Sequence, residues 1–467
     1  MTIRTVGPNS DFRSIAAAMQ VSGPGDTLRL ELGYSDETAT IAYSGMTIEG
    51  SAYSRNIVLN LGLGVATVVL TGTAPIQVND ASDGNGIVGN AGNNLITVTA
   101  GADAVDGGLG NDRLVVDYRN AVGAVTGDST SNFTEAGGGG RMVSITDGTI
   151  EHFTILSGEG TDTITTGAGN DIIKTGQGAS TVSAGQGANT IIGGGNADTI
   201  TALDGGNYVN AGDGANTITT GGGADVIYSG VGADTIISGG GSDHITLLGG
   251  ADSVNSGAGD DRLVINYAAL SSDVSGGVTG GNLITGYVGH FADLAGSSVD
   301  FQESENFTIT SGGGNDALTT RGGADILSGN SGSDRLNSGG GQDRLFGGAG
   351  GDTLRGGTGT DTLTGGAGAD VFVFASVAEA STGLGDDLIT DFQIGIDRIG
   401  LTAIDADLNT AGNQGFHFIG LAQFSSVAGE LRYVDGLVTG DVNGDGMADF
   451  TIDIASVSGL TQSDFVL

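Results

Sequence analysis

The sequence has no cysteine and no tryptophan, and it holds only 3 prolines and 15 basic residues among 467. Without cysteine, neither disulfide bonds nor thiolate metal sites can form, so other metal sites remain as the means of cross-linking the chain. The scarcity of proline excludes a collagen-like or proline-rich chain. Because 54 residues are acidic, the net charge is −39. A surface this negative repels nucleic acid and anionic membranes and attracts divalent cations.

Long apolar runs and catalytic motifs are also missing. The longest apolar stretch, at residues 61–70, is too short to span a bilayer, and the first residues contain no apolar core of a cleavable signal peptide. We therefore expect no membrane span, and export by a route that needs no such signal. The sequence contains no H-E-x-x-H zinc-protease motif and no G-x-S-x-G elbow. Each histidine precedes Phe or Ile, which predicts ordinary strand residues at His152, His244, His290 and His417.

What the chain has instead is glycine and a repeat. It contains 91 glycines, and residues 157–264 divide without a gap into twelve nine-residue units; seven more units occupy 311–373 and four occupy 80–115. The consensus is G-G-x-G-x-D-x-U-x, where U is aliphatic. A high net charge with few aromatic residues is also typical of a disordered chain. Regular aliphatic positions are what such chains lack, so we expect disorder only in the metal-free protein.

Each unit has a physical interpretation. Its glycines permit the positive φ angles of a tight turn, and the tripeptide x-U-x forms a short strand in which only U points inward. Two units complete one coil, so turns 18 residues apart lie on the same side. A cation between two such turns meets carbonyl oxygens and one aspartate from each turn, which suits Ca²⁺ rather than zinc. A thin core is expected from Ile164, Ile173, Val182, Ile191, Ile200 and their successors.

The sixth position of the unit supplies the candidate calcium ligands. These are Asp103, Asp112, Asp162, Asp171, Asp198, Asp225, Asp234, Asp243, Asp252, Asp261, Asp316, Asp325, Asp334, Asp343, Asp352, Asp361 and Asp370. A separate candidate is an EF-hand-like segment with Ile452 in place of its final glutamate, and with oxygens from Asp441, Asn443, Asp445 and Asp449. For that segment, a calcium site and a solvated turn are both open interpretations.

Aspartate is unevenly distributed over the sixth positions. Every unit has one at 225–261 and at 316–370, so same-side turns pair two aspartates there. A neutral oxygen attracts a dication less strongly than a carboxylate does. We therefore predict tight calcium binding in those two stretches, and sparse binding with amide hydrogen bonds at 175–219. The residues that replace aspartate are Ser180, Asn189, Asn207 and Asn216.

The nonapeptide consensus resembles the hemolysin-type (RTX) calcium-binding repeat, over about half of the chain. The resemblance implies an all-β fold, a right-handed parallel β-helix or β-roll solenoid, with multiple Ca²⁺ ions and an extracellular location. We assign RTX blocks to 80–115, 157–264 and 311–373. The segments between them, 116–156 and 265–310, share their flanking sequences, D-R-L-V before and F-T-I after. We interpret these segments as outgrowths of a duplicated module, which form either a partner-binding surface or a divergent rung or hairpin without a ligand.

Residues 1–79 differ from the repeats. The pattern predicts a helix over residues 10–20, capped by Ser10 or Asn9, with an apolar face made by Phe12, Ile15, Ala16 and Met19. Short aliphatic strands are expected at 28–32, 46–48, 57–61 and 66–70. This arrangement resembles the start of a pectate-lyase-like β-helix, which implies a short N-terminal capping helix at the end of the solenoid.

The last segment, 374–467, contains D-L-I-T-D-F at 387–392, G-I-D-R-I at 395–399, G-E-L-R-Y at 429–433 and D-F-V-L at 464–467, with the EF-hand-like segment between. These residues resemble the C-terminal domain of serralysin-type secreted metalloproteases. The resemblance implies a C-terminal β-rich domain that directs type I secretion. The protease domain of that family is absent from this sequence.

Two functions fit these observations. The first is a secreted protein folded by Ca²⁺, with a structural or adhesive role at the cell surface or matrix. Its partners are calcium, the type I secretion machinery and a polysaccharide or cell-surface component. The second is a polysaccharide lyase or epimerase on the β-helix scaffold, with Tyr34, Asp36 and Glu37 as the nearest catalytic candidates. Because fewer than eighty residues give too few coils for a substrate groove, we predict the first function and assign no catalytic residue.

Overall fold

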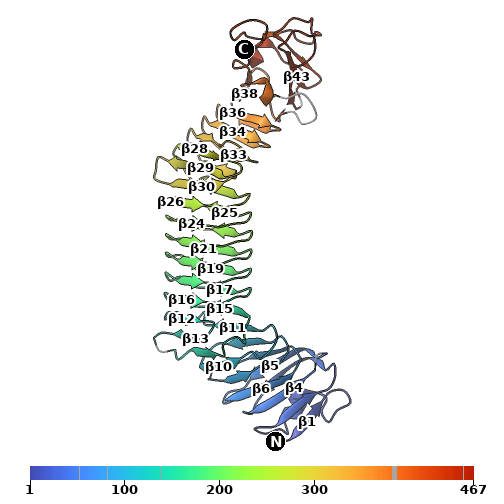
Figure 1. The fold of residues 1–467 in the computed structure, drawn as a ribbon, viewed down its shortest axis with the longest axis vertical. Helices are drawn as coiled ribbons and strands as arrows, with labels where there is room; N and C mark the ends of the chain where they lie inside the picture. Colours follow the sequence, from blue (N-terminus) through green and yellow to red (C-terminus); the bar gives the residue numbers. More distant parts are fainter. Residues whose placement is uncertain (52, 81–82, 138, 381–386, 456) are drawn as a thin grey trace. The chain divides into compact units, whose positions relative to one another are not determined.

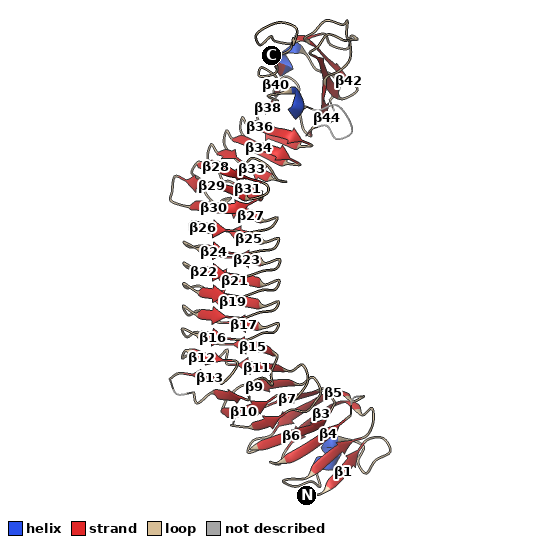
Figure 2. Ribbon diagram, in the orientation of Figure 1, coloured by secondary structure: helices blue, strands red, loops and turns tan. Residues whose placement is uncertain are grey.

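The computed structural model describes residues 1–51, 53–80, 83–137, 139–380, 387–455 and 457–467. Strands make up nearly all of the regular structure (Figure 2). The chain divides into two compact units, Met1–Gly230 and Val231–Leu467, and each is described by itself. Within the described ranges, no helix is long and apolar enough to cross a bilayer. The expectation of an all-β chain with long parallel sheets is confirmed.

In the first unit, successive strands mostly alternate between two sheets (Figure 1). The first sheet has the order β1 (Ile3–Val6), β2 (Thr27–Leu30), β4 (Met46–Gly50), β6 (Thr67–Gly72), β8 (Gly86–Val88), β10 (Ala102–Asp106), β14 (Met142–Ile145), β13 (Asn132–Glu135), β12 (Val125–Asp128), β16 (Thr163–Thr165), β18 (Thr181–Ser183), β20 (Thr199–Thr201) and β22 (Thr217–Thr219). The second has the order β3 (Ser35–Ile41), β5 (Arg55–Leu61), β7 (Ile76–Asn79), β9 (Leu95–Val98), β11 (Arg113–Asp117), β15 (His152–Leu156), β17 (Ile172–Lys174), β19 (Thr190–Gly194), β21 (Tyr208–Gly212) and β23 (Val226–Tyr228).

The second unit repeats this plan. Its first sheet has the order β24 (Thr235–Ile237), β26 (Ala251–Asn255), β30 (Ser298–Ser304), β29 (Gly286–Asp293), β28 (Val274–Asn282), β32 (Ala317–Thr319), β34 (Arg335–Gly341), β36 (Thr353–Gly359), β38 (Val371–Val373), β40 (Arg398–Gly400) and β45 (Phe465–Val466). The second has the order β25 (His244–Leu247), β27 (Arg262–Asn266), β31 (Asn306–Thr310), β33 (Ile326–Ser328), β35 (Arg344–Ala349), β37 (Thr362–Ala367), β39 (Leu388–Ile389), β44 (Phe450–Ile454), β43 (Leu437–Asp441), β42 (Glu430–Val434) and β41 (His417–Phe418). Two short 3-10 helices are η1 (Val377–Glu379) and η2 (Gln462–Asp464).

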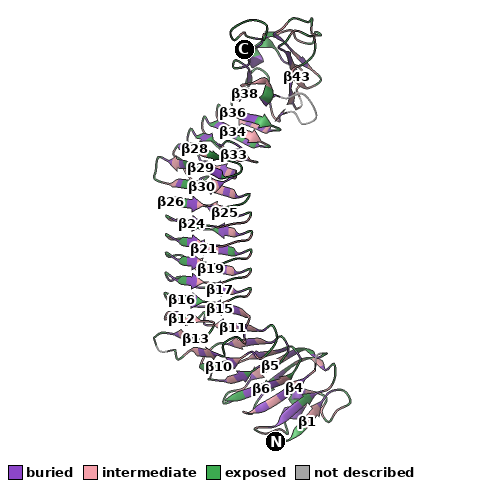
Figure 3. Ribbon diagram, in the orientation of Figure 1, coloured by how far each residue is buried: buried purple, intermediate pink, exposed green. Residues whose placement is uncertain are grey.

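The nine-residue period sets the register between neighbouring strands. Ile164 pairs with Val182 and Val182 with Ile200 in the first sheet, whereas Ile173 pairs with Ile191 in the second. Each pair is 18 residues apart, and each of these side chains is at most 2% exposed. Figure 3 shows the resulting alternation of buried and exposed residues along the strands. The predicted two-unit coil and aliphatic core are confirmed.

The glycines of a unit serve different purposes, as the unit that begins at Gly347 shows. Gly348 and Gly350 have φ angles of +113° and +140°, which L side chains rarely adopt. Gly347 does not need a positive φ. A Cβ atom there would lie 2.5 Å from Oδ2 of Asp352. The first glycine therefore makes room for the carboxylate of its own unit.

The helix near the N-terminus, α1 (Ile15–Met19), begins later than the sequence pattern predicts. Its N-cap is Ser14, whose Oγ accepts the N–H of Ala17 at 3.0 Å. The predicted cap at Ser10 or Asn9 is wrong because the chain up to Phe12 is held as a β-bridge to the first strand. The buried face consists of Ile15, Ala18 and Met19, whereas Ala16 is exposed.

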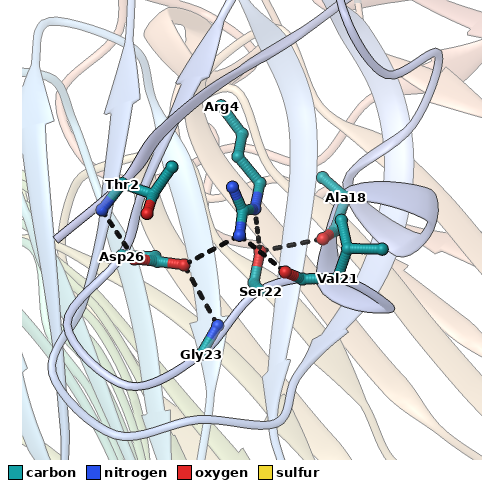
Figure 4. Close-up of polar contacts among 7 residues, drawn as sticks. All are labelled: Thr2, Arg4, Ala18, Val21, Ser22, Gly23 and Asp26. Carbon is teal, nitrogen blue, oxygen red and sulfur yellow. Dashed lines mark hydrogen bonds and ion pairs between the residues drawn. The ribbon is translucent and has the colours of Figure 1, made fainter.

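Polar contacts fasten this helix to strand β1 (Figure 4). Asp26 accepts the N–H of Thr2 at 2.6 Å and that of Gly23 at 3.1 Å, and it pairs with the guanidinium of Arg4 at 3.2 Å. The backbone bond from Thr2 is the largest of the effects that hold the pKa of Asp26 below its ordinary value. Arg4 also donates to the carbonyl of Val21 at 2.6 Å. The turn after α1 is thereby tied to the first strand.

Each outgrowth is an antiparallel addition to the first sheet of its unit. Between β10 and β16, the first sheet contains β14, β13 and β12, whereas the second sheet contains only β15 between β11 and β17. In the second unit, β30, β29 and β28 lie between β26 and β32, opposite the single strand β31. The first sheet therefore gains two strands at each outgrowth, and the coil resumes after it.

The segment after the last repeat continues the roll. Strand β39 pairs in parallel with β37 of the last repeats, and β40 pairs in parallel with β38. Strands β44 and β45, from the end of the chain, extend the same two sheets. Antiparallel strands β42 and β43 then follow β44. The C-terminal residues thus cover the end of the two sheets in their unit.

Candidate calcium sites

The aspartates at the sixth position form ladders of hydrogen bonds along the turns. Oδ1 of Asp334 accepts the backbone N–H of Asp316 at 2.8 Å, and Oδ1 of Asp352 accepts that of Asp334 at 2.8 Å. Asp343 likewise accepts from Asp325 at 2.8 Å. All seventeen predicted aspartates of the repeats have at most 2% of their surface exposed. The predicted ligands therefore point inward, between turns 18 residues apart.

The second carboxylate oxygen of many of these residues has no partner. Within the described ranges, no hydrogen bond reaches the buried Oδ2 atoms of Asp103, Asp112, Asp252, Asp261, Asp316, Asp334, Asp352, Asp361 and Asp370. A buried carboxylate oxygen without a donor is strongly unfavourable unless a cation lies beside it. These oxygens are therefore the first indication of metal sites.

We call residues 175–219 the middle repeats. Their asparagines show what the second terminal atom of the side chain faces, which is Nδ2 in asparagine and Oδ2 in aspartate. Nδ2 of Asn207 donates to the carbonyls of Leu203 and Gly205, at 2.9 and 2.8 Å. Nδ2 of Asn216 donates to the carbonyls of Gly212 and Gly214, at 3.1 Å each. These carbonyls belong to the second and fourth positions of the same unit.

Asn189 makes the same contacts, to Gly185 at 3.4 Å and Gly187 at 3.0 Å. At an aspartate, the atom in this place is an oxygen, so a carboxylate oxygen and turn carbonyls face one another with no proton between them. Carboxylate and carbonyl oxygens are the ligands that Ca²⁺ prefers. The residues present therefore fit calcium, and the asparagine amide occupies the place that the cation would take.

The remaining sixth positions near the middle repeats are satisfied within the protein. Asp162 accepts the N–H of Val125 with one oxygen and the hydroxyl of Ser157 with the other. Asp198 accepts the N–H of Ser180 at 2.7 Å and that of Gly194 at 3.1 Å. These carboxylates depend less on a cation than those of residues 311–373, which we call the late repeats.

Burial without a counter-charge raises the pKa of the ladder aspartates. Desolvation is the largest cause, and it raises the pKa of Asp252 and Asp334 to about 7 and that of Asp361 and Asp370 to about 6. Repulsion from neighbouring aspartates adds to the effect, as Asp316 and Asp352 do at Asp334. A bound dication would oppose both causes.

The first repeat block has a mixed ladder. Asp103 accepts the N–H of Asn85 at 2.8 Å, and Asp112 accepts that of Asn94 at 2.6 Å. Burial raises the pKa of both aspartates to about 7. Asp171, in the next block, accepts the N–H of Phe153 at 2.7 Å. These residues take part in the same kind of ladder as the late repeats.

The EF-hand-like segment has a different arrangement. The oxygens of Asp441 accept the N–H groups of Gly444 and Gly446, at 2.6 and 2.9 Å. Asp449 accepts the N–H of Val442 at 2.7 Å and a side-chain N–H of Asn443. The loop's own amides thus use oxygens that a cation would need, which favours the turn interpretation. In the described parts of the chain, no three acidic or histidine side chains converge on a metal position, so the roll sites depend on carbonyl oxygens as well.

Four acidic residues outside the nonapeptide pattern make the same contact as the repeat aspartates. Asp387 and Asp397 accept the N–H groups of Asp361 and Asp370, at 2.7 and 3.0 Å, and so continue the ladder beyond the repeats. Glu151 and Glu305 occupy the corresponding place after the two outgrowths. Their common signal is an acidic residue two positions before a buried strand residue, the D-x-U part of the repeat without its glycines.

The residues considered as catalytic candidates, Tyr34, Asp36 and Glu37, make contacts that stabilise the local fold. Glu37 accepts the N–H groups of Ile15 and Ala16 at 2.8 and 3.0 Å, and it also accepts the hydroxyl of Tyr34. Asp36 accepts the side-chain N–H of Asn56 at 2.7 Å. The histidines lie in strands, as expected, in β15, β25, β29 and β41. The contacts of Glu37 and Asp36 thus hold the helix and neighbouring strands in place. His290 differs from the other histidines, because its Nδ1 lies 2.7 Å from Oδ1 of Asp300 and both residues line a surface cavity.

Comparison with known families agrees with the geometry. The family model of the RTX calcium-binding nonapeptide repeat, which spans four copies, matches residues 82–114, 154–182, 175–209, 201–236, 229–263, 310–345 and 346–376. No curated protein matches the chain. The chain therefore contains RTX repeats in several copies, and such repeats bind Ca²⁺. Proteins with these repeats are typically secreted and are generally structural calcium binders.

Proposed function

We propose that the protein is an extracellular β-roll that leaves the cell by type I secretion, folds on binding Ca²⁺, and has a structural or adhesive role at the cell surface or matrix. The observation that carries this proposal is the ladder of buried aspartates whose second oxygens have no donor. Such a ladder is unfavourable without metal and favourable with it. Calcium is thus a condition for the fold.

The energetics suit an extracellular location. Extracellular calcium modules bind with Kd values of about 10⁻⁴ to 10⁻³ M. At ten times the Kd, each site stabilises the folded state by about 1.4 kcal/mol. Because the late repeats have an aspartate in every unit, several such contributions add there. A chain that meets little calcium inside the cell stays unfolded, which suits passage through an exporter.

Circular dichroism in EDTA and then in millimolar Ca²⁺ tests calcium-driven folding. We expect a weak β signal in EDTA that rises cooperatively with calcium. Magnesium at the same concentration is the matched control, since it requires a small octahedral site and is dehydrated reluctantly. A full β signal in EDTA would refute the proposal.

Export needs a test that separates signal from fold. Since residues 374–467 also extend the sheets of the roll, their deletion would expose the end of those sheets. Fusing this segment to an unrelated reporter avoids that problem. In a host with a type I exporter, we expect the reporter in the medium, and a fusion with a shuffled segment should remain in the cells. Equal export of both fusions would contradict the type I route.

The structural or adhesive role predicts retention without turnover. The contacts of Glu37 with the N–H groups of the helix support this role over a lyase or epimerase that would use residues 34–37. Cells or isolated matrix polysaccharide should retain the calcium-bound protein and release it in EDTA. Release of unsaturated oligosaccharides from the polysaccharide would instead identify the protein as a lyase.

A further inference from the structure

The ladder of carboxylates is interrupted at each outgrowth, and a glutamate closes it. In an ordinary coil the backbone N–H of Asp243 is accepted by Asp261, 18 residues later, at 2.8 Å. The N–H of Asp261 has no such partner 18 residues on, because the outgrowth follows. It is accepted by Oε2 of Glu305 at 2.9 Å. In the first unit, Oε2 of Glu151 accepts the N–H of Asp112 at 2.6 Å.

The aspartate of each pair has an unpartnered oxygen. Asp112 and Asp261 have no exposed surface, and neither Oδ2 atom has a hydrogen-bond partner in the described ranges. Oδ2 of Asp112 faces its own turn, 3.0 Å from the place of a Cβ on Gly107. The turn also touches the segment that brings the glutamate, because the N–H of Gly107 donates to Oγ1 of Thr149 at 3.0 Å.

The second unit repeats these contacts with different residues. Ser256, at the first position of the turn that contains Asp261, lies with its Oγ 2.6 Å from Oγ of Ser304. Ser304 directly precedes Glu305, which is 3% exposed. The two outgrowths differ in length and composition, yet both return a glutamate to the same place. Glu305 is thus a second buried acid beside Asp261, whereas Glu151 is partly buried beside Asp112. A turn held only by packing would not require an acid in this place.

The nearby arginines do not neutralise these pairs. Arg113 donates to the carbonyls of Phe153 and Asn170, at 3.0 and 2.8 Å. Arg262 donates to the hydroxyl of Thr308 and the carbonyl of Ala324, at 3.1 and 2.9 Å. Both guanidinium groups therefore lie along the strands and bind strand and turn oxygens.

We propose that the pairs Asp112–Glu151 and Asp261–Glu305 are two further calcium sites, each bridging the turn before an outgrowth to the turn after it. The longer glutamate reaches across the place where the regular coil is broken, and its carboxylate replaces the missing aspartate. Calcium there fastens the base of the outgrowth to the roll. This inference rests on the proposed calcium-dependent fold and adds sites outside the nonapeptide pattern.

The double variant E151Q/E305Q tests the inference, with E159Q/E303Q as the matched control of equal charge change. Native mass spectrometry should count two fewer calcium ions per chain in the double variant than in the wild type and the control. In the double variant, hydrogen exchange should show that strands β12–β14 and β28–β30 need at least tenfold more calcium for protection than in the wild type. The calcium concentration that protects the strands of the middle repeats should be unchanged. If the double variant does not fold, the single variants replace it, each with the other site as an internal reference.

The outcomes separate the two proposals. A wild-type protein that binds no calcium and folds in EDTA overturns the proposed function itself. A calcium-dependent wild type whose E151Q/E305Q variant keeps the full calcium count and unchanged outgrowth protection overturns only the two bridging sites. The shorter variants E151D/E305D retain the charge, and we expect them to keep the ions at several-fold lower affinity.

Discussion

The middle repeats and the late repeats share one nine-residue period but fill their turns differently. In the middle repeats, an asparagine amide donates to the turn carbonyls, as Asn207 does to Gly205. In the late repeats, an aspartate places an unpartnered oxygen in the same position, as Asp352 does. Both regions have glycines in the turn and a buried apolar residue at the eighth position, which is Val or Ile in the middle repeats and Leu or Phe in the late repeats. The period therefore specifies the roll, and the sixth residue decides whether the turn needs a cation.

Removing calcium should separate the two regions most clearly. In EDTA, we expect the strand amides of the late repeats to lose all protection, because their buried carboxylates repel one another. The middle repeats should keep part of theirs, since their turns are closed by amides. Hydrogen exchange followed by mass spectrometry resolves the two segments, and readdition of calcium is the control. Equal loss of protection in both regions would show that the sixth residue does not matter.

Acidification should partly replace calcium in the late repeats. An unfolded aspartate titrates near its ordinary pKa of 3.8, whereas burial raises the pKa of Asp334 to about 7 and that of Asp361 and Asp370 to about 6. A raised pKa means that protonation stabilises the fold. This stabilisation is complete below about pH 4 and is lost as the pH rises through about 6 to 7.

In EDTA, we therefore expect more β signal at pH 5.5 than at pH 8, within about the range where these groups titrate. The gain should lie in the late repeats by hydrogen exchange corrected for pH. With calcium present, protons compete for the same oxygens, so the apparent affinity should fall over the same interval. A metal-free protein that is equally folded at both pH values would contradict the raised pKa values.

Converting the middle repeats to the late type should have a smaller effect. The variant N189D/N207D/N216D replaces three donors by acceptors, and each unsatisfied group costs about 1–3 kcal/mol. In EDTA, we expect a lower midpoint of urea unfolding, which millimolar calcium restores. Asn210→Asp is the control, because it adds charge on strand β21 while its Oδ1 keeps the N–H bond from Gly212. Destabilisation that calcium does not reverse would mean that the amides fill no cation position.

The smallest effect is expected from a single methyl group in the late repeats. A Cβ on Gly356 would lie 2.2 Å from Oδ2 of Asp361, whereas a Cβ on Gly313 would lie 3.9 Å from its nearest neighbour. Overpacking of this kind costs about 1–3 kcal/mol. We expect Gly356→Ala to raise the calcium concentration at the folding midpoint and Gly313→Ala to leave it unchanged. Identical midpoints would show that the carboxylate can move aside.

The regular part of the fold could be predicted from the sequence because every unit repeats the same nine-residue pattern. Ile164 and Val182 occupy the same position of their units, so their stacking follows from the repeat itself. The buried aspartates follow for the same reason. The contrast between Asn207 and the aspartates was also predictable, since one atom decides whether the group donates or accepts.

The exceptions lie where the contact depends on tertiary structure. Glu151 and Glu305 lie 39 and 44 residues from the aspartates that they contact. Because these two separations differ from each other and from 18, the repeat spacing does not predict the contacts. Asp387 is 26 residues from Asp361, beyond the last repeat. The helix start at Ser14 was missed because Glu37, from a later strand, accepts the first N–H groups of that helix. Local propensity cannot show a partner that the fold brings from elsewhere.

The 18-residue register also bears on the order of folding. Because each coil pairs only with its neighbours, contacts are short in sequence and the roll can grow one coil at a time. At each outgrowth this growth must close a longer loop. At the first outgrowth, about 40 residues separate Ala102 from its strand partner Met142. Closing such a loop costs about 0.7 kcal/mol more than closing 18 residues. We therefore expect two pauses in an otherwise continuous propagation, one at each outgrowth.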